Sequence, residues 1–196
     1  MTNIPFNDAR WTTLNKATYE PKISKDGQEI SFPTEKETDW WRTPTGIDSA
    51  SGLVYGFEYK FDPKEGVEIS VDVDVQARIQ CSISDQAALF LRVDSKTWIK
   101  AGLEFDHDQL WAGAVVTSPY SDWNIQPHSP SISRFTITLQ DQKLKVYFND
   151  NPMREVNAFG DGKSNSAFIG VMGCSPKSEG AIVTFNNFTV KKGVRD

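Results

Sequence analysis

Residues 67–75 alternate strictly between apolar and polar side chains, and this pattern constrains the fold more than any other feature of the chain. Successive side chains of a β-strand point to opposite faces of its sheet. The apolar residues therefore share one face, and the polar residues Glu68, Ser70, Asp72 and Asp74 share the other. A strand of this kind buries one face against a core and leaves the other in water, as strands of antiparallel sheets do.

The same alternation recurs along most of the chain. Further strands are predicted at Lys22–Ser24, Glu29–Phe32, Trp40–Arg42, Leu53–Phe61, Ala87–Asp94, Trp98–Phe105, Gln109–Thr117, Phe135–Leu139, Leu144–Phe148, Ala167–Cys174 and Ala181–Val190. The best helical candidate is a single turn at Asn7–Trp11, and Ser118–Ser133, rich in proline and serine, is predicted to be an irregular loop. About a dozen strands with turn signals about every ten residues predict an all-β fold, a two-sheet antiparallel jelly-roll sandwich.

Length and charge narrow the class of protein further. A chain of 196 residues fits a single β-sandwich domain, 1–196. The net charge of −5 opposes binding to nucleic acid or anionic lipid, because both bind basic surfaces. The chain shows neither a basic leader with an apolar run nor a stretch of about 18 apolar residues, so we expect a cytoplasmic protein. There the thiols of Cys81 and Cys174 are expected to be reduced, although the sequence leaves their redox state open.

The acidic face of residues 67–75 is the first candidate for chemistry. Side chains two positions apart on a strand lie ~6.6 Å apart, so Asp72 and Asp74 could form the carboxylate pair that glycosidases use. Ser70, however, stands where jelly-roll glucanases often carry the aspartate of such a strand. The spacing permits a carbohydrate-active enzyme, and a solvated polar face is the simpler interpretation.

Two later strands carry charges on their polar faces, Arg92 and Asp94 on one and Lys100 and Glu104 on the other. If these strands neighbour the acidic strand, opposite charges pair across the sheet, each pair contributing ~0.2–1 kcal/mol. The same face, together with Trp98, is also what a carbohydrate or a small polar ligand would meet.

Tryptophans form the second group of candidates. Trp40 and Trp41 are adjacent, so on a strand they must point to opposite faces. One enters the core, and the other, beside Asp39 and Arg42, either stacks on a ligand ring or is covered by the loop that follows. Trp123 lies in the predicted loop, and a large apolar side chain on a surface commonly marks an interaction site.

No motif for catalysis, for a metal or for a cofactor stands out. The two histidines, His107 and His128, lie far apart, and no cysteine–histidine cluster has metal-binding spacing. Gly160–Ser164 ends like a phosphate-binding loop, but Asn157 stands where that motif needs glycine, and a strand follows where it needs a helix. We therefore predict no catalytic residue, no metal and no cofactor, and favour a protein that is not an enzyme.

Five blocks of sequence resemble a known family when taken in order. They are Thr38–Arg42, Ala88–Asp94, Trp98–Glu104, Ser121–Trp123 and Gly173–Pro176. Over nearly the whole chain they resemble the concanavalin A-like jelly-roll proteins of otherwise unknown function. The resemblance implies a lectin/glucanase-type sandwich, a cytoplasmic location, and an indirect role in regulating the glycolytic enzyme enolase, linked to sugar metabolism. It implies no established catalytic activity.

The shared blocks of the family map onto polar and aromatic residues already singled out, namely Asp39, Trp41, Arg42, Arg92, Asp94, Trp98, Lys100 and Glu104. With Asp72 and Trp123 they make up the predicted ligand-binding set. We predict a regulatory or binding protein whose polar concave sheet face holds a carbohydrate, a small polar ligand or a partner such as enolase, on which it could act directly or indirectly. The alternative is a carbohydrate-active enzyme or carbohydrate-binding module that uses the acidic strand or Glu104.

Overall fold

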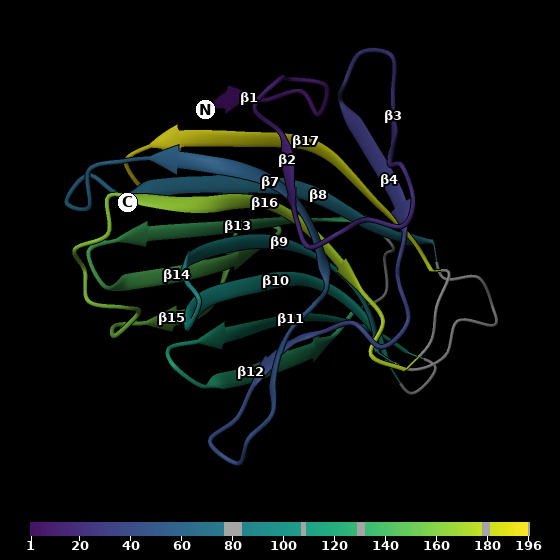
Figure 1. Ribbon diagram of the computed structural model, residues 1–196. Coiled ribbons are helices and arrows are strands. Elements are labelled where there is room, and N and C mark those ends of the chain that lie inside the picture. Colours follow the sequence, from purple (N-terminus) through teal and green to yellow (C-terminus); the bar gives the residue numbers. More distant parts are fainter. Residues whose placement is uncertain (77–83, 107–108, 129–131, 178–180, 196) are drawn as a thin grey trace.

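Two large antiparallel sheets pack face to face and form a sandwich (Figure 1), which confirms the predicted all-β jelly-roll class. The computed structural model describes residues 1–76, 84–106, 109–128, 132–177 and 181–195. Among them no helix is long and apolar enough to cross a membrane. The helical turn predicted at Asn7–Trp11 is wrong, because two reverse turns, closed by Asp8 N–H to Pro5 C=O and by Trp11 N–H to Asp8 C=O, take its place.

Sheet A has the strand order β15-β14-β13-β8-β17-β4-β3, with β1 also paired to β17. Its strands are β1 (Thr2–Asn3), β3 (Lys22–Ile23), β4 (Glu29–Pro33), β8 (Val67–Gln76), β13 (Ile132–Gln140), β14 (Lys143–Phe148), β15 (Asn151–Val156) and β17 (Ile182–Lys192). Sheet B has the order β12-β11-β10-β9-β16-β7-β2. Its strands are β2 (Thr12–Leu14), β7 (Leu53–Lys60), β9 (Asp85–Asp94), β10 (Thr97–Asp106), β11 (Gln109–Thr117), β12 (Ser121–Pro127) and β16 (Ser166–Cys174).

The main core lies between the two sheets and confirms the alternation that predicted them. All five apolar residues of the segment 67–75 are buried there from sheet A. Ile99, Ala101 and Leu103 of β10 meet them from sheet B. Burying one large aliphatic side chain contributes about 1.5–3 kcal/mol, so these alternating runs supply much of the drive for the two sheets to pack.

The acidic strand β8 lies between β13 and β17 in sheet A, whereas Arg92 and Lys100 belong to sheet B. The interpretation that their charges pair with the acidic strand is therefore wrong. Asp72 instead accepts hydrogen bonds from Arg134 of β13 at 2.7 Å and from Asn187 of β17 at 2.8 Å, on the outer face of sheet A. Alternation assigns the face of each side chain, but the neighbour of a strand depends on pairing between segments far apart in the chain.

On the same outer face, Arg195 covers the buried carboxylate of Glu68. Glu68 is only 1% exposed. Arg195 donates hydrogen bonds to its carboxylate from the backbone N–H at 2.9 Å and from the guanidinium at 2.8 and 3.1 Å. The same guanidinium donates to Asp150 and lies over the Tyr147 ring. Because a buried charge is costly unless it is paired and hydrogen-bonded, Arg195 permits Glu68 to occupy this position.

The segment predicted to be a loop, Ser118–Ser133, contains β12 and the first two residues of β13, so that prediction is wrong for residues 121–127 and 132–133. β12 pairs with β11 along its whole length, with Val115 opposite Trp123. β12 is the edge strand of sheet B, and proline is tolerated on an edge because one side of the strand needs no N–H donors. Pro119 and Pro127 mark the approach and the end of this strand, which explains why a proline-rich segment can still extend the sheet.

A small hairpin, β5 (Trp40–Arg42) and β6 (Asp48–Ala50), covers part of the outer face of sheet B. In Figure 1 it projects past the edge of the sheet beside β12, and the Arg42 N–H donates to the Ser121 hydroxyl of β12 at 2.8 Å. Under the hairpin a second apolar cluster has Trp40, Phe90 and Trp98 at its centre. The hairpin therefore turns part of an outer sheet face into a buried interior.

Candidate functional site

A pocket of about 280 Å³ opens on the outer face of sheet B, beside the hairpin, and is called the Lys100 pocket below. Its walls are Asp39, Trp41, Ser84, Gln86, Lys100, Glu104, Asp106, Val115, Trp123 and Pro176. Sites for small ligands usually measure about 300–1,000 Å³. The volume therefore suits a ligand of the size of a monosaccharide better than a large cofactor.

Strand alternation places the polar groups of the pocket. Lys100, Gly102 and Glu104 are spaced two apart on β10 and share its outward face. Register then sets their neighbours, because Lys100 lies opposite Val115 of β11 and Glu104 lies opposite Gln86 of β9. The two charged side chains thus stand on either side of a glycine.

Small residues make room between these charged groups. Ala88, Gly102 and Gly113 lie side by side on β9, β10 and β11 and line a recess of about 20 Å³ that shares several walls with the Lys100 pocket. A methyl group on Gly102 would come within 1.9 Å of the Ala87 carbonyl oxygen. A recess of this size holds about one water molecule.

The ammonium group of Lys100 is buried and ion-paired. The side chain is 4% exposed, and its Nζ lies 2.8 Å from Oδ1 of Asp39. The Asp39 carboxylate also accepts the N–H of Trp40 at 2.7 Å. These contacts neutralise the ammonium and fix both side chains at the wall of the pocket.

Hydrogen bonds with Ser51, and from Ser175 to the neighbouring Thr38, hold Asp39 in place. Its carbonyl accepts the N–H of Ser51 at 2.9 Å, and its own N–H donates to the Ser51 hydroxyl. One residue earlier, Thr38 accepts the N–H of Ser175 at 3.1 Å, which fastens this segment to the end of β16. The Ser175 hydroxyl in turn donates to the buried carboxylate of Asp85. A network of backbone and hydroxyl groups therefore positions the carboxylate that meets Lys100.

Burial raises the pKa of Glu104 from 4.5 to about 7. The nearby carboxylates of Asp106 and Asp39 raise this pKa further, whereas the ammonium of Lys100 and the indole N–H of Trp123 lower it. The side-chain amide of Gln86 donates to Glu104 over a long distance of 3.5 Å. A carboxyl group that titrates near neutral pH can donate or accept a hydrogen bond.

Two tryptophans flank the polar groups. Trp123 of β12 is 43% exposed, and Trp41 of the hairpin is half-buried against the second apolar cluster. Both line the Lys100 pocket. Indole rings beside hydrogen-bonding groups form a surface on which a flat apolar face of a ligand can stack.

Five of the ten predicted ligand-binding residues line this pocket, namely Asp39, Trp41, Lys100, Glu104 and Trp123. Three others lie on the same side of sheet B in different roles. Trp98 is 1% exposed and packs on Trp40 and Phe90. The guanidinium of Arg92 lies over the Trp40 ring, and that of Arg42 pairs with Asp48.

The remaining two predicted residues lie elsewhere. Asp94 is exposed at the end of β9, where its carboxylate accepts the N–H of Lys96 at 2.7 Å. Asp72 lies on the outer face of sheet A, as described above. His107 and Cys81 fall outside the described residues, and Cys174 is fully buried, which raises the pKa of its thiol well above the usual range.

Sequence reasoning missed part of the wall, notably Gln86 and Asp106. Alternation carried two residues further along the same strand could have found Asp106, because it follows Glu104 by two positions. Gln86 required the register of β9 against β10, which places it opposite Glu104. Among the described residues, no group of three or more histidine, cysteine, aspartate or glutamate side chains is arranged to hold a metal ion.

Comparison with known proteins gives a family and a fold. A family model described as "Protein of unknown function (DUF1349)" matches residues 17–193. The protein "Regulation of enolase protein 1" of Saccharomyces cerevisiae is 25% identical over 195 residues, and the match covers 93% of each chain.

Two solved structures share the architecture. A functionally unknown protein from Saccharomyces cerevisiae has a TM-score of 0.80 at 24% identity, covering 95% of this chain and 98% of its own. Carbohydrate-binding module CBM66 from Bacillus subtilis has a TM-score of 0.55 at 13% identity, covering 95% of this chain and 98% of its own. Both likenesses confirm the jelly-roll sandwich.

Proposed function

Since the chain belongs to the DUF1349 family of proteins of unknown function, we propose from its geometry that it is a non-enzymatic binding protein whose Lys100 pocket holds a carbohydrate. The observation that carries the proposal is the pairing of Trp41 and Trp123 with the polar groups of Lys100 and Glu104 around one small cavity. Sugars have an apolar face that stacks on indole and hydroxyls that bond to charged and amide groups. The likeness to a carbohydrate-binding module supports the same ligand class.

The proposal can be tested by titrating the protein with a panel of neutral monosaccharides and following both heat and tryptophan fluorescence. Trp123→Ala is expected to weaken binding at least about tenfold, because stacking on an exposed indole is lost. Tyr120→Ala is the matched control, since Tyr120 is 48% exposed at the same edge but does not line the pocket. A panel without any binder, or equal effects of the two variants, would overturn the proposal.

We also propose the finer role that the name of the yeast relative suggests, in which the occupied pocket affects enolase, and we propose that this happens in the cytoplasm. Contact with enolase is either direct or indirect. Titration of purified enolase with and without the bound sugar separates the two, since a direct contact produces a saturable signal. An unchanged effect on enolase in cells that carry Trp123→Ala would show that the pocket is not involved.

One observation favours a second candidate, a glycoside hydrolase. Glu104 has a pKa of about 7, which suits a general acid, and Asp106 lies two positions along the same strand face. Turnover of a glycan library that is abolished by Glu104→Gln but kept by Asp72→Asn would establish hydrolysis. Absence of turnover with sugar binding intact would leave the binding protein.

A further inference from the structure

We infer that the sugar bound in the Lys100 pocket carries a protonated amino group, which is recognised by Glu104. The inference rests on the proposed function and narrows its ligand class. It starts from the charges on the wall, where Asp39, Glu104 and Asp106 face a single base, Lys100, among the described lining residues. The ammonium of Lys100 is bonded to Asp39 at 2.8 Å, so the pair carries no net charge.

Among the described lining residues, acidic side chains outnumber basic ones. Burial and the carboxylates of Asp106 and Asp39 disfavour the ionised form of Glu104, whereas the ammonium of Lys100 favours it. Its neighbours supply weak neutral donors, the Gln86 amide at 3.5 Å and the Trp123 indole. A second cation brought to Glu104 removes this repulsion and makes a charge-assisted hydrogen bond, which is about twice as strong as a neutral one.

The walls suit an ammonium group in a second way. Trp41 and Trp123 line the same cavity as Glu104, and the face of an indole attracts cations more strongly than other aromatic rings do. An amino sugar can place its ring on one indole while its amine reaches the carboxylate. A sugar phosphate or a uronate, in contrast, brings an anion to a wall that already repels one.

The groups around Glu104 also determine how binding depends on pH. Asp39 and Lys100 form an ion pair, Asp106 is a carboxylate on the same strand face, and the thiol of Cys174 stays protonated because burial raises its pKa. Among the described lining residues, Glu104 is therefore expected to change charge between pH 6 and 8. An ammonium ligand binds the ionised form, so its affinity should fall about tenfold from pH 8 to pH 6, whereas a neutral sugar should change little.

The test uses three sugars that differ only at carbon 6: glucose, 6-amino-6-deoxyglucose and glucuronate. Titration calorimetry on the full chain at pH 8 is expected to give at least about tenfold tighter binding of the amine than of glucose. Glucuronate is expected to bind at least about tenfold more weakly than glucose. Nα-acetyl-lysine amide, an ammonium without a sugar ring, should bind more weakly than the amino sugar. If it binds equally well, the ring contributes nothing and the inference fails.

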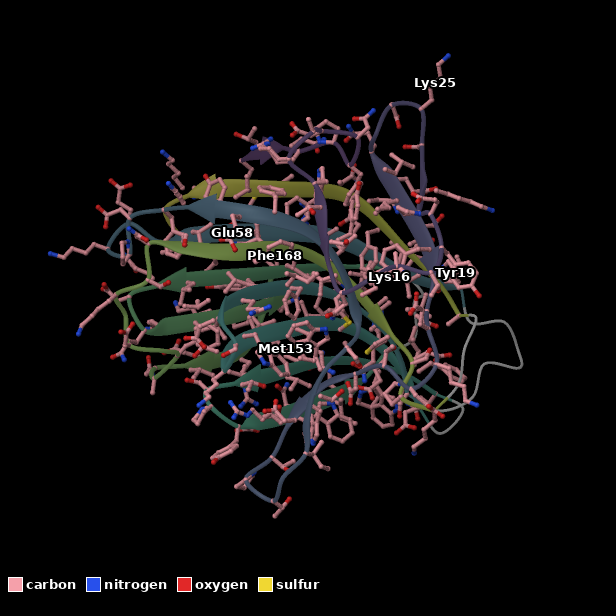
Figure 2. All side chains as sticks on the ribbon, in the orientation of Figure 1. Lys16, Tyr19, Lys25, Glu58, Met153 and Phe168 are labelled. Carbon is pink, nitrogen blue, oxygen red and sulfur yellow. The ribbon has the colours of Figure 1, made fainter. Side chains whose placement is uncertain are left out.

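Glu104→Gln gives the decisive variant. It should bring the affinity for the amine to that of the same variant for glucose and abolish the pH dependence of amine binding. Glu58→Gln is the matched control, because Glu58 is an exposed carboxylate on β7, next to Phe168 of β16 (Figure 2), and should change neither ligand.

The outcomes separate this inference from the proposed function. If the unmutated protein binds glucose and the amine with equal affinity, the inference that the sugar carries an amino group is overturned, and the proposal of sugar binding stands. Absence of binding by the three sugars and by the neutral panel overturns both. A preference for the amine that survives in Glu104→Gln overturns the assignment to Glu104.

Discussion

The ammonium nitrogen of Lys100 lies 2.8 Å from a carboxylate oxygen of Asp39, a residue 61 positions earlier in the chain. Lys100 belongs to sheet B, and Asp39 leads into the hairpin that covers the outer face of that sheet. This ion pair thus joins the sheet to its cover at the edge of the pocket. The pair should therefore contribute both to stability and to the shape of the site.

Asp39→Asn is expected to lower the free energy of unfolding by about 2 kcal/mol, because it leaves the buried ammonium without its carboxylate. Lys100→Met should cost less, since the Asp39 side chain is 26% exposed and can be hydrated. Urea denaturation of both variants and of the double variant measures the coupling, which we expect to be about 1 kcal/mol or more. Additive effects would mean that the two groups do not interact in solution.

Stability should fall as pH rises through the range in which Glu104 titrates. Its pKa is about 7 in the folded protein and 4.5 in an unfolded chain, so between these values the folded state holds a proton that the unfolded state releases. The loss should be of the order of 2 kcal/mol between pH 4.5 and pH 8, because solvent in the open pocket screens part of the shift.

Glu104→Gln should remove this part of the pH dependence and make the protein more stable than the unmutated chain at pH 8. Urea unfolding at several pH values from 5 to 8 provides the comparison, with Glu58→Gln as the exposed control. If the free energies of unfolding of the unmutated protein and of Glu104→Gln change in parallel with pH over this range, Glu104 does not titrate as described.

The glycines beneath the pocket should differ sharply in their tolerance of a methyl group. Gly102→Ala places a Cβ 1.9 Å from the Ala87 carbonyl oxygen, which the sheet cannot move away, and should cost about 3 kcal/mol or more. At Gly113 the nearest atoms are 3.0 Å away on Ile125 and 3.1 Å away on Asn124, at the edge strand β12. Gly113→Ala should therefore cost only about 1 kcal/mol. Thermal unfolding of the pair tests this order, and a reversed order would contradict the packing.

Removal of the Arg195 side chain should destabilise the sandwich far from the pocket. Arg195→Ala leaves the carboxylate of Glu68, which is 1% exposed, without its guanidinium, and breaking a buried pair costs about 3–5 kcal/mol. Adding Glu68→Gln should recover part of the loss, because the uncompensated charge is then gone. Chemical denaturation of the single and double variants measures both steps. A further loss in the double variant would show that charge is not the cause.

Much of the fold could be predicted from the sequence, because alternation is a local property. The segment 67–75 buries the five side chains that its pattern assigned to the core. The pairing of strands could not be predicted in this way. The outward carboxylates of β8 accept hydrogen bonds from Arg134, Asn187 and Arg195, all distant in the chain, and do not pair with the charges of β9 and β10.

The candidate site was accessible to sequence reasoning only in part. Lys100 and Glu104 stood out as charges on the polar face of one strand, and the structure places both in the pocket. Trp98 shares that face, but the hairpin folds over it and buries it against Trp40. No local pattern indicates which outward residues a distant hairpin will cover, so the open and the covered parts of the face look alike in sequence.

The position of β17 has a consequence for how the protein is made. This late strand is hydrogen-bonded on one side to β8 and on the other to β4, both of which leave the ribosome long before it. Until residues 182–192 emerge, the nascent chain exposes two unpaired strand edges beside an unfinished core. Synthesis that stalls shortly before this strand should therefore yield an aggregation-prone chain that depends on chaperones, whereas emergence of β17 closes both edges with one segment.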